Sequence, residues 1–395
     1  MVDIDWDLFS SYAGLLSLAS LSIYVGSYGS LPKPKRSQTG KGTTKSSETD
    51  DEDEGEVVEH MSSEDAWLFP IIGSVALLGL YTIVKYLGTD WINWFLGWYF
   101  SIAGVGSVWK SSTSLVRWLA GETRWKSFHH FRLVVQKNKQ SIISLSWRSP
   151  TVVLLPLAFA PSLFYHLSAT SRKSILVTDI LGLSFAHNAL SLLKIDSFKT
   201  GSILLGGLFL YDIWWVFGTE VMVKVATSLD LPIKLLWPKS LSLAGERGYT
   251  MLGLGDIVIP GTFIALALRY DHHRHLRDRQ SPARRLDKFS KPYFHASLAA
   301  YVLGLMMTMT VMHVFHAAQP ALLYLSPACV LSFVATATLR GELKEAWSWN
   351  DDPANETKKE LNDGPKQAAK AEAVKEAAAT SSSQDHVPEV HQSTS

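Results

Sequence analysis

The sequence predicts an all-α membrane protein with nine transmembrane helices. Its apolar residues gather in blocks of about 17 to 25, the length that an α-helix needs to cross roughly 30 Å of hydrocarbon, and the charged residues lie between these blocks. The 37 basic and 36 acidic side chains leave a net charge of +1, so composition gives no indication of a nucleic-acid partner. The lipid bilayer is therefore the expected surrounding of most of the chain.

Nine apolar segments are long enough to be spans. The predicted spans are Tyr12–Leu31, Ala66–Leu87, Trp91–Val108, Thr151–Leu167, Ile175–Leu193, Ser202–Val223, Thr250–Leu268, Phe294–Ala317 and Gln319–Leu339. The fifth is the weakest, because Asp179, His187 and Asn188 dilute it; the histidine and the asparagine are expected to bridge helices. The fourth contains Pro156 and Pro161, which spanning helices tolerate when neighbouring groups satisfy the freed carbonyls.

Basic loops predict how the chain is oriented, because Lys and Arg resist translocation. Two loops, between spans three and four and between spans seven and eight, hold most of the basic residues in and around the spans. With nine spans both loops lie on one side, which we take as cytosolic; the amino terminus is then lumenal and the carboxyl tail cytosolic. The acidic leader MVDIDWD fits a lumenal start and an uncleaved first span rather than a secretory signal. The sequon at Asn355 should then stay unglycosylated.

The chain divides into four predicted parts. Residues 1–65 hold the lumenal amino terminus, the first span and a charged cytosolic loop; residues 66–200 hold spans two to five; residues 201–343 hold spans six to nine; residues 344–395 form a cytosolic tail. The loop from Pro32 to Asp65 and the tail read as disordered connectors by composition. The single cysteine, Cys329, excludes an intramolecular disulfide and is expected to pack in an apolar region.

Two aspartates stand inside predicted spans. Asp212 lies in span six within GGLFLYDIWWVFG, and Asp256 lies in span seven within TMLGLGDIVIPG. Each carboxylate costs roughly 2.5 to 3.5 kcal/mol near the centre of a spanning helix, so both need a protein interior and indicate a function. Counted from the cytosolic ends of the two antiparallel spans, they lie at similar depths of about 16 and 20 Å. The two carboxyl groups are therefore expected to face each other.

Two carboxyl groups close together in a low dielectric cannot both ionise, so the pair should share one proton. The ionised partner can act as general base on a water molecule while the protonated partner polarises a peptide carbonyl, which is the chemistry of an aspartic protease. An interhelical hydrogen bond or an ion site is the structural alternative for each aspartate alone. Gly253 and Gly255 remove side chains beside Asp256, which favours close approach of another backbone; plain helix packing is the alternative.

A third feature opens span nine, where Gln319 is followed by Pro320, Ala321 and Leu322. Proline is ordinary at the first position of a helix. Within the membrane, however, such a start leaves backbone groups without helical partners, and protein, water or substrate must satisfy them. We expect an extended transmembrane substrate to pair its backbone with an irregular stretch near this motif.

With these residues the sequence resembles signal peptide peptidase, in the presenilin-type family of intramembrane aspartyl proteases. The family's YD motif appears as Tyr211-Asp212, its GxGD motif as Gly253-Leu254-Gly255-Asp256, and its PAL motif as Pro320-Ala321-Leu322. The resemblance runs from about Leu68 to Trp349 and is strongest from Gly182 onward.

The resemblance implies a presenilin-like fold of nine spans with Asp212 and Asp256 as the catalytic pair. It implies Tyr211, Gly253, Leu254, Gly255, Gln319 and the PAL residues as supporting or substrate-binding positions, with no metal or organic cofactor. Residence in the endoplasmic reticulum membrane is also implied, with remnant signal peptides and type II membrane anchors as substrates. The chain ends in HQSTS, without the dilysine retrieval signal that is frequent in this branch.

Two other classes of function stay open on the sequence alone. Membrane aspartates also bind protons or cations in coupled transporters, and a non-catalytic relative could escort membrane segments as a chaperone. A homo-oligomer or partners in quality control in the endoplasmic reticulum also stay open. Tyr211 is expected to serve the site because it adjoins Asp212, and Glu220 and Lys224, one helical turn apart, are expected to pair.

Overall fold

The structure is a computed structural model that describes residues 6–32, 59–137, 140–167, 174–229, 231–239, 249–278, 289–315 and 319–351. The helices are α1 (Trp6–Gly29), α2 (Ser63–Leu87), α3 (Thr89–Ser127), α4 (Ser149–Leu167), α5 (Ile175–Leu192), α6 (Phe198–Phe217), α7 (Val221–Ser228), α8 (Gly255–Asp278), α9 (Pro292–Phe315), α10 (Leu322–Leu339) and α11 (Leu343–Ser348). The strands are β1 (Glu59–Met61), β2 (His130–Lys137), β3 (Gln140–Arg148), β4 (Leu193–Ile195), β5 (Lys234–Pro238) and β6 (Tyr249–Gly253).

Two predicted connectors fall mostly outside the described residues. The carboxyl tail beyond residue 351, which includes Asn355, is not described, nor is the loop over residues 33–58. The first residues of the predicted tail were wrongly expected to be disordered, because α11 covers Leu343–Ser348. The end of that loop was predicted wrongly as disordered, because residues 59–61 form β1 and α2 begins at Ser63. The helix starts there because Ser62 and Asp65 form a capping box, in which each side chain bonds the other residue's backbone N–H.

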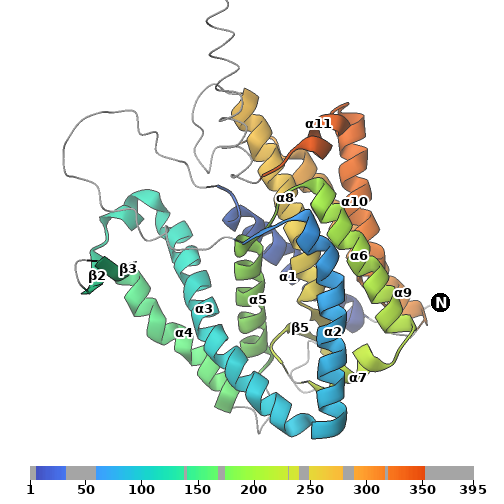
Figure 1. Ribbon diagram of the computed structural model, residues 1–395, viewed down its shortest axis with the longest axis horizontal. Coiled ribbons are helices and arrows are strands. Elements are labelled where there is room, and N and C mark those ends of the chain that lie inside the picture. The colour runs from blue at the N-terminus through green and yellow to red at the C-terminus, as the bar shows by residue number, and fades with distance from the viewer. Residues whose placement is uncertain are drawn as a thin grey trace, which may run out of the picture. The chain divides into compact units, whose positions relative to one another are not determined.

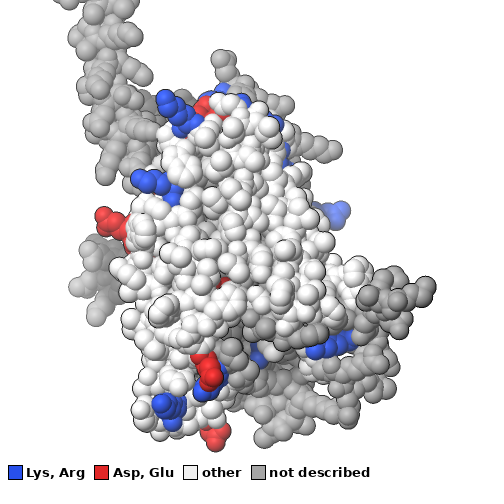
Figure 2. Space-filling model, turned by 90° about the vertical axis from the view of Figure 1, so that its right-hand side faces the viewer, with Lys and Arg blue, Asp and Glu red and all other residues white. Residues whose placement is uncertain are grey.

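A long helix coincides with every predicted span, namely α1, α2, α3, α4, α5, α6, α8, α9 and α10. Seven of these helices are long and apolar enough to cross a membrane, the exceptions being α3 and α8. The multi-pass membrane architecture is confirmed, while the count of nine crossings stays a prediction. Figure 2 shows a broad surface of mostly uncharged side chains, with one small acidic spot near its middle and most of the charged side chains toward its two ends, as expected for a surface that faces lipid.

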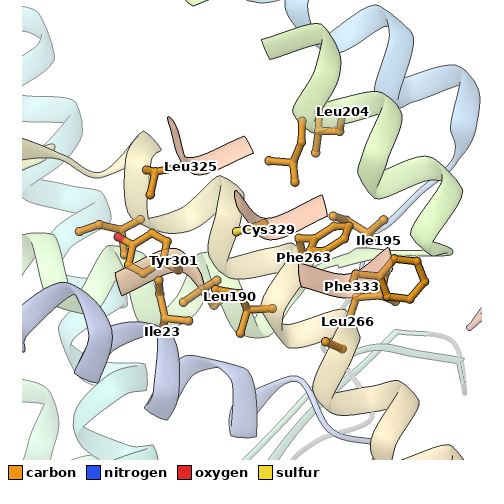
Figure 3. Packing of buried hydrophobic residues seen from close by; sticks show 14 of the residues in the cluster. Ile23, Leu190, Ile195, Leu204, Phe263, Leu266, Tyr301, Leu325, Cys329 and Phe333 are labelled. Carbon is orange, nitrogen blue, oxygen red and sulfur yellow. The ribbon is translucent and has the colours of Figure 1, made fainter. Parts of the chain in front are cut away.

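Helix α8 lies at the centre of the described helices (Figure 1), and α1, α5, α6, α9 and α10 all pack against it. Every residue from 260 to 272 is buried, which keeps the charged side chains of Arg269 and Asp271 away from lipid. Aromatic rings fill the space around it: Phe198 of α6 stacks on Phe333 of α10 with ring centroids 3.9 Å apart. Figure 3 shows Phe333 and Phe263 of α8 in this core. Cys329 is fully buried in this core, which confirms its predicted packing role.

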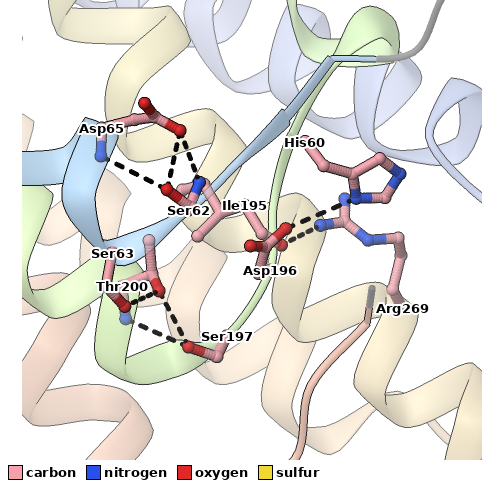
Figure 4. A network of polar contacts seen from close by, with 9 residues as sticks. All are labelled: His60, Ser62, Ser63, Asp65, Ile195, Asp196, Ser197, Thr200 and Arg269. Atoms are coloured by element: carbon pink, nitrogen blue, oxygen red, sulfur yellow. Dashed lines mark hydrogen bonds and ion pairs between the residues drawn. The ribbon is translucent and has the colours of Figure 1, made fainter. Parts of the chain in front are cut away.

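A small parallel sheet of β1 and β4 ties one end of α6 to α2 and α8 (Figure 4). Arg269 of α8 is 2% exposed and donates a hydrogen bond to the carbonyl oxygen of Ile195 at 2.9 Å. The hydroxyl groups of Ser63 and Thr200 lie 2.9 Å apart and join the starts of α2 and α6. The beginning of α6 and the far end of α8 are therefore held at one level of the bundle.

Two predicted polar contacts are confirmed. The side-chain amide of Asn188 in α5 donates to the carbonyl oxygen of Ser107 in α3 at 2.9 Å, so it bridges two helices as expected. Glu220 and Lys224 form the predicted ion pair, at 3.0 Å. Span six was predicted to reach Val223, but α6 ends at Phe217 with Gly218 as its C-cap, and α7 follows as a separate helix.

Gly201 lets α6 approach α8 closely, and we expect Gly201→Ala to destabilise the protein. A Cβ atom at this position would lie 2.7 Å from Cδ2 of Phe263, whose fully buried ring has no free space to enter. Overpacking of this kind costs roughly 1 to 3 kcal/mol. Thermal unfolding of the purified protein in detergent measures the effect.

Gly206→Ala is the matched control, since a Cβ atom at Gly206 meets nothing within 4 Å on the same helix. It should leave the unfolding temperature unchanged or raise it, because alanine favours a helix by about 1 kcal/mol over glycine. Equal effects of the two substitutions would contradict the close packing of α6 on α8 at Gly201.

Candidate active site

Asp256 lies in the first turn of α8, directly after the hairpin of β5 and β6. The two strands pair antiparallel with Leu235 opposite Leu252, and the N–H of Leu254 continues the pairing by donating to the carbonyl oxygen of Ile233 at 3.0 Å. The helix begins immediately afterwards, because the N–H of Val258 bonds the carbonyl oxygen of Leu254 at 2.8 Å. The hairpin therefore fixes where α8 starts and where Asp256 stands.

The start of predicted span seven was wrong. Thr250 to Gly253 belong to β6, so Asp256 is in the first turn of a helix and not near its centre. The apolar run before Asp256 is too short for its periodicity to distinguish a strand from a helix. Gly253 and Gly255 mark the change from strand β6 to helix α8 and do not lie inside one long helix.

Asp212 is held by the start of α10. Its side chain is 4% exposed, and its Oδ2 accepts the backbone N–H of Leu322 at 3.1 Å. Leu322 is the first residue of α10, where backbone N–H groups have no helical partner and the helix dipole favours negative charge. The structure thus brings Asp212 of the YD motif onto Leu322 of the PAL motif, 110 residues further along the chain.

The two aspartates lie at the same level because the ends of their helices are tied together. Asp212 lies fourteen residues beyond Phe198, the first residue of α6, which is about 21 Å along the axis. Asp256 lies thirteen residues before Arg269, about 20 Å along the antiparallel α8, and Arg269 is bonded to Ile195 close to the start of α6. Their carboxyl groups accordingly interact electrostatically.

The predicted glycines stand in open space. A Cβ atom at Gly253 would meet only Oδ2 of Asp256, at 3.4 Å, and one at Gly255 would meet no described atom within 4 Å. Gly253 pairs with Lys234 of β5, so a neighbouring backbone does approach it, whereas Gly255 has no strand partner among the described residues. Leu254 between them is 7% exposed, with its side chain directed into the protein near Gly182 of α5.

The remaining predicted residues adjoin Asp212 or its partner Leu322 in the chain. The ring of Tyr211 faces α2, since a Cβ atom at Gly73 would lie 3.6 Å from its Cε2 atom. Pro320 and Ala321 form the turn before α10, where the N–H of Leu323 bonds the carbonyl oxygen of Pro320 at 3.2 Å. Gln319 precedes this turn and is partly exposed.

Sequence reasoning missed the groups that hold the hairpin. Oδ1 of Asp179 in α5 accepts the backbone N–H of Leu236 in β5 at 2.8 Å, although the sequence analysis treated this aspartate only as a weakness of its span. From the other side, the hydroxyl oxygens of Ser11 in α1 and Thr250 in β6 lie 2.5 Å apart. A carboxyl group within an apolar span was the signal that could have pointed to Asp179.

The described residues contain no group of three or more His, Cys, Asp or Glu side chains placed to hold a metal ion. The reactive groups of the site are two acidic side chains, Asp212 and Asp256, on neighbouring helices of a membrane protein. Such a pair can share a proton and activate water, which is the arrangement of an aspartyl protease that works within the bilayer.

Comparison with known proteins gives the same class and a family. Residues 52–353 match the family model described as Signal peptide peptidase. The chain is 38% identical over 356 residues to signal peptide peptidase of Mus musculus, covering 88% of this chain and 86% of that protein. It is 37% identical over 353 residues to the protein of that name from Homo sapiens, covering 87% and 85%. The chain belongs to the signal peptide peptidase family, whose members are intramembrane aspartyl proteases.

A fungal protein is also similar to this chain over most of its length. The chain is 36% identical over 306 residues to a probable intramembrane protease of Schizosaccharomyces pombe, covering 78% of this chain and 89% of that protein.

Proposed function

We propose that Asp212 and Asp256 are the catalytic pair with which this protease hydrolyses peptide bonds inside transmembrane segments. The observation that carries the proposal is the convergence of three separate chain segments: Asp212 bonds the N–H of Leu322 and interacts with Asp256 at the start of α8. Each of these residues belongs to a motif that the resemblance assigns to the site.

The surroundings suggest different roles for the two carboxyl groups at the start of the reaction. The N–H of Leu322 and the positive end of α10 stabilise negative charge on Asp212, which makes it the general base that takes a proton from the attacking water. Asp256 receives no hydrogen bond from the described residues and keeps the shared proton, which it donates to the carbonyl oxygen. The water oxygen adds to the carbonyl carbon and gives a gem-diol. Asp212 then passes its proton to the nitrogen, Asp256 takes a proton back from a hydroxyl group of the gem-diol, and the C–N bond breaks to release an amine and a carboxylic acid without a covalent enzyme intermediate.

An extended substrate can reach this pair along β6. In the described chain β6 pairs only with β5, and its other edge carries no strand. Because the N–H of Leu254 points toward β5, alternation along the strand turns the backbone N–H groups of Gly253 and Met251 outward. We place the substrate backbone along this free edge of β6. The substrate then pairs with the strand that leads into Asp256, and not with the PAL region as the sequence suggested.

The substrates proposed are remnant signal peptides, in accord with the name of the mammalian relatives, and type II membrane anchors, which the family resemblance implies. The proposed location is the endoplasmic reticulum membrane with a lumenal amino terminus and a cytosolic carboxyl terminus. The two basic loops of the sequence support this orientation.

A cleavage assay combined with active-site labelling tests the proposal. Purified protein is incubated with a labelled signal peptide, and mass spectrometry identifies the products. A photoreactive peptide isostere with a hydroxyl group at the scissile position should label the wild-type protein, and labelling should disappear in Asp212→Asn and in Asp256→Asn. Intact peptide together with labelling independent of both aspartates would favour a membrane-segment escort or a transporter instead.

A further inference from the structure

Asp179 is a buried acidic side chain that the proposed chemistry does not use. It lies in the apolar helix α5, is 9% exposed, and accepts the backbone N–H of Leu236 at 2.8 Å. An acidic side chain within a spanning helix is costly to insert, and such residues usually have a specific partner and a role. Its partner is the backbone of β5, which does not itself carry a catalytic group.

The hydrogen bond closes the outer edge of the hairpin. Since Ile233 bonds Leu254 across the strands, alternation along β5 directs the N–H of Leu236 away from β6 and toward α5. Close packing continues one turn further along α5, where a Cβ atom at Gly182 would lie 3.1 Å from Leu235 and 3.5 Å from the carbonyl oxygen of Lys234. Helix α5 therefore covers the edge of β5 that β6 leaves free.

The same hydrogen bond acts on Asp256 through a short and well-connected path. Leu236 lies three residues from Ile233, whose carbonyl oxygen holds Leu254, and Leu254 is two residues from Asp256. The side chain of Leu254 also lies against α5, since a Cβ atom at Gly182 would be 3.5 Å from its Cδ1 atom. A shift of β5 relative to α5 would move the first turn of α8.

We propose that Asp179 is a positioning residue for peptide-bond cleavage. By anchoring Leu236 it fixes the hairpin, and through the hairpin it fixes Asp256 opposite Asp212. It also leaves β6 as the one hairpin edge of the described chain that is open to an extended peptide. This proposal rests on the proposed function, because it assumes that Asp256 takes part in the reaction.

The test replaces Asp179 in two ways that keep the size of the side chain. Asp179→Asn retains an oxygen that can accept the N–H of Leu236, whereas Asp179→Leu leaves that N–H without its acceptor. Asp179→Leu should lower kcat about 10- to 100-fold, because the hairpin that positions Asp256 loses its anchor on α5 and a small misplacement of a reacting group has an effect of this size. Asp179→Asn should stay within about threefold of wild type, since it keeps the hydrogen bond.

Asn188→Leu provides a matched control on the same helix. Asn188 is also 9% exposed, but its hydrogen bonds go to Ser107 of α3 and not to the hairpin. This variant should lose thermal stability to a similar extent while kcat stays unchanged. A merely structural role for Asp179 would make the leucine variants at both positions behave alike.

Hydrogen exchange gives a readout that does not depend on activity. The peptide that contains Leu236 should exchange faster in Asp179→Leu, and at the wild-type rate in Asn188→Leu and in Asp179→Asn. Wild-type kcat in Asp179→Leu, or an equal loss of kcat in Asn188→Leu, would overturn the positioning role. Cleavage by Asp256→Asn in the same series would instead overturn the proposed function, so the two failures are distinguishable.

Discussion

Asp256→Asn should reduce cleavage of a transmembrane peptide by roughly 10³-fold or more, with little change in thermal stability. An asparagine keeps the size of the side chain but cannot hold the proton that the pair must pass to the substrate. Removal of a general acid or base typically costs 10²- to 10⁴-fold, and the upper part of this range is expected where two groups act as one unit. Quantitative mass spectrometry of the products from purified protein measures the change.

Two further variants make this prediction specific. Asp212→Asn should cause a loss of the same size, and the double variant should be no worse than either single variant, because removing one partner already disables the pair. Asp271→Asn is the control: Asp271 lies on the same helix, but it accepts the N–H of Phe294 and belongs to the packing of α8 on α9. Cleavage by Asp256→Asn at the wild-type rate, or losses that multiply in the double variant, would contradict a shared catalytic unit.

Most of the helical architecture could be predicted from the sequence, because the length and apolarity of a segment decide whether it can span a membrane. Asp212 and Asp256 were found by the same reasoning, since a charge within an apolar span is conspicuous. Their meeting depends on two antiparallel helices held at their ends, and the bond from Arg269 to Ile195 that holds them spans 74 residues. A contact of that range has no local sequence signal.

The hairpin was missed for a different reason. Tyr249 to Gly253 continue directly into the apolar start of α8, and so short a run offers too few residues to reveal a period of two. The role of Asp179 was missed with it, because its partner is a backbone N–H, which every residue but proline possesses. The PAL region was predicted in part: backbone groups there need partners outside their helix, and the structure supplies Asp212 as the partner of Leu322.

Met251→Pro should lower kcat/KM by about 10- to 100-fold if the substrate adds to the open edge of β6. Proline removes the backbone N–H of Met251, which points away from β5, so the hairpin loses none of its own hydrogen bonds. A substrate carbonyl then stays unpaired in an environment with little water, at a cost of about 1 to 3 kcal/mol. Steady-state cleavage of a labelled signal peptide measures the loss.

Met251→Leu separates the backbone from the side chain at this position. It changes the exposed side chain, which is 61% accessible, and keeps the N–H, so it should cleave at close to the wild-type rate. A short transition-state analogue that fills only the space between Asp212 and Asp256 should bind Met251→Pro as tightly as wild type, because the catalytic pair is untouched. If Met251→Pro cleaves normally, or if Met251→Leu loses as much, the substrate takes another path to the aspartates. A loss confined to Met251→Pro and to extended substrates would show that the strand before Asp256 recognises the peptide backbone, which explains how one site can accept many transmembrane sequences.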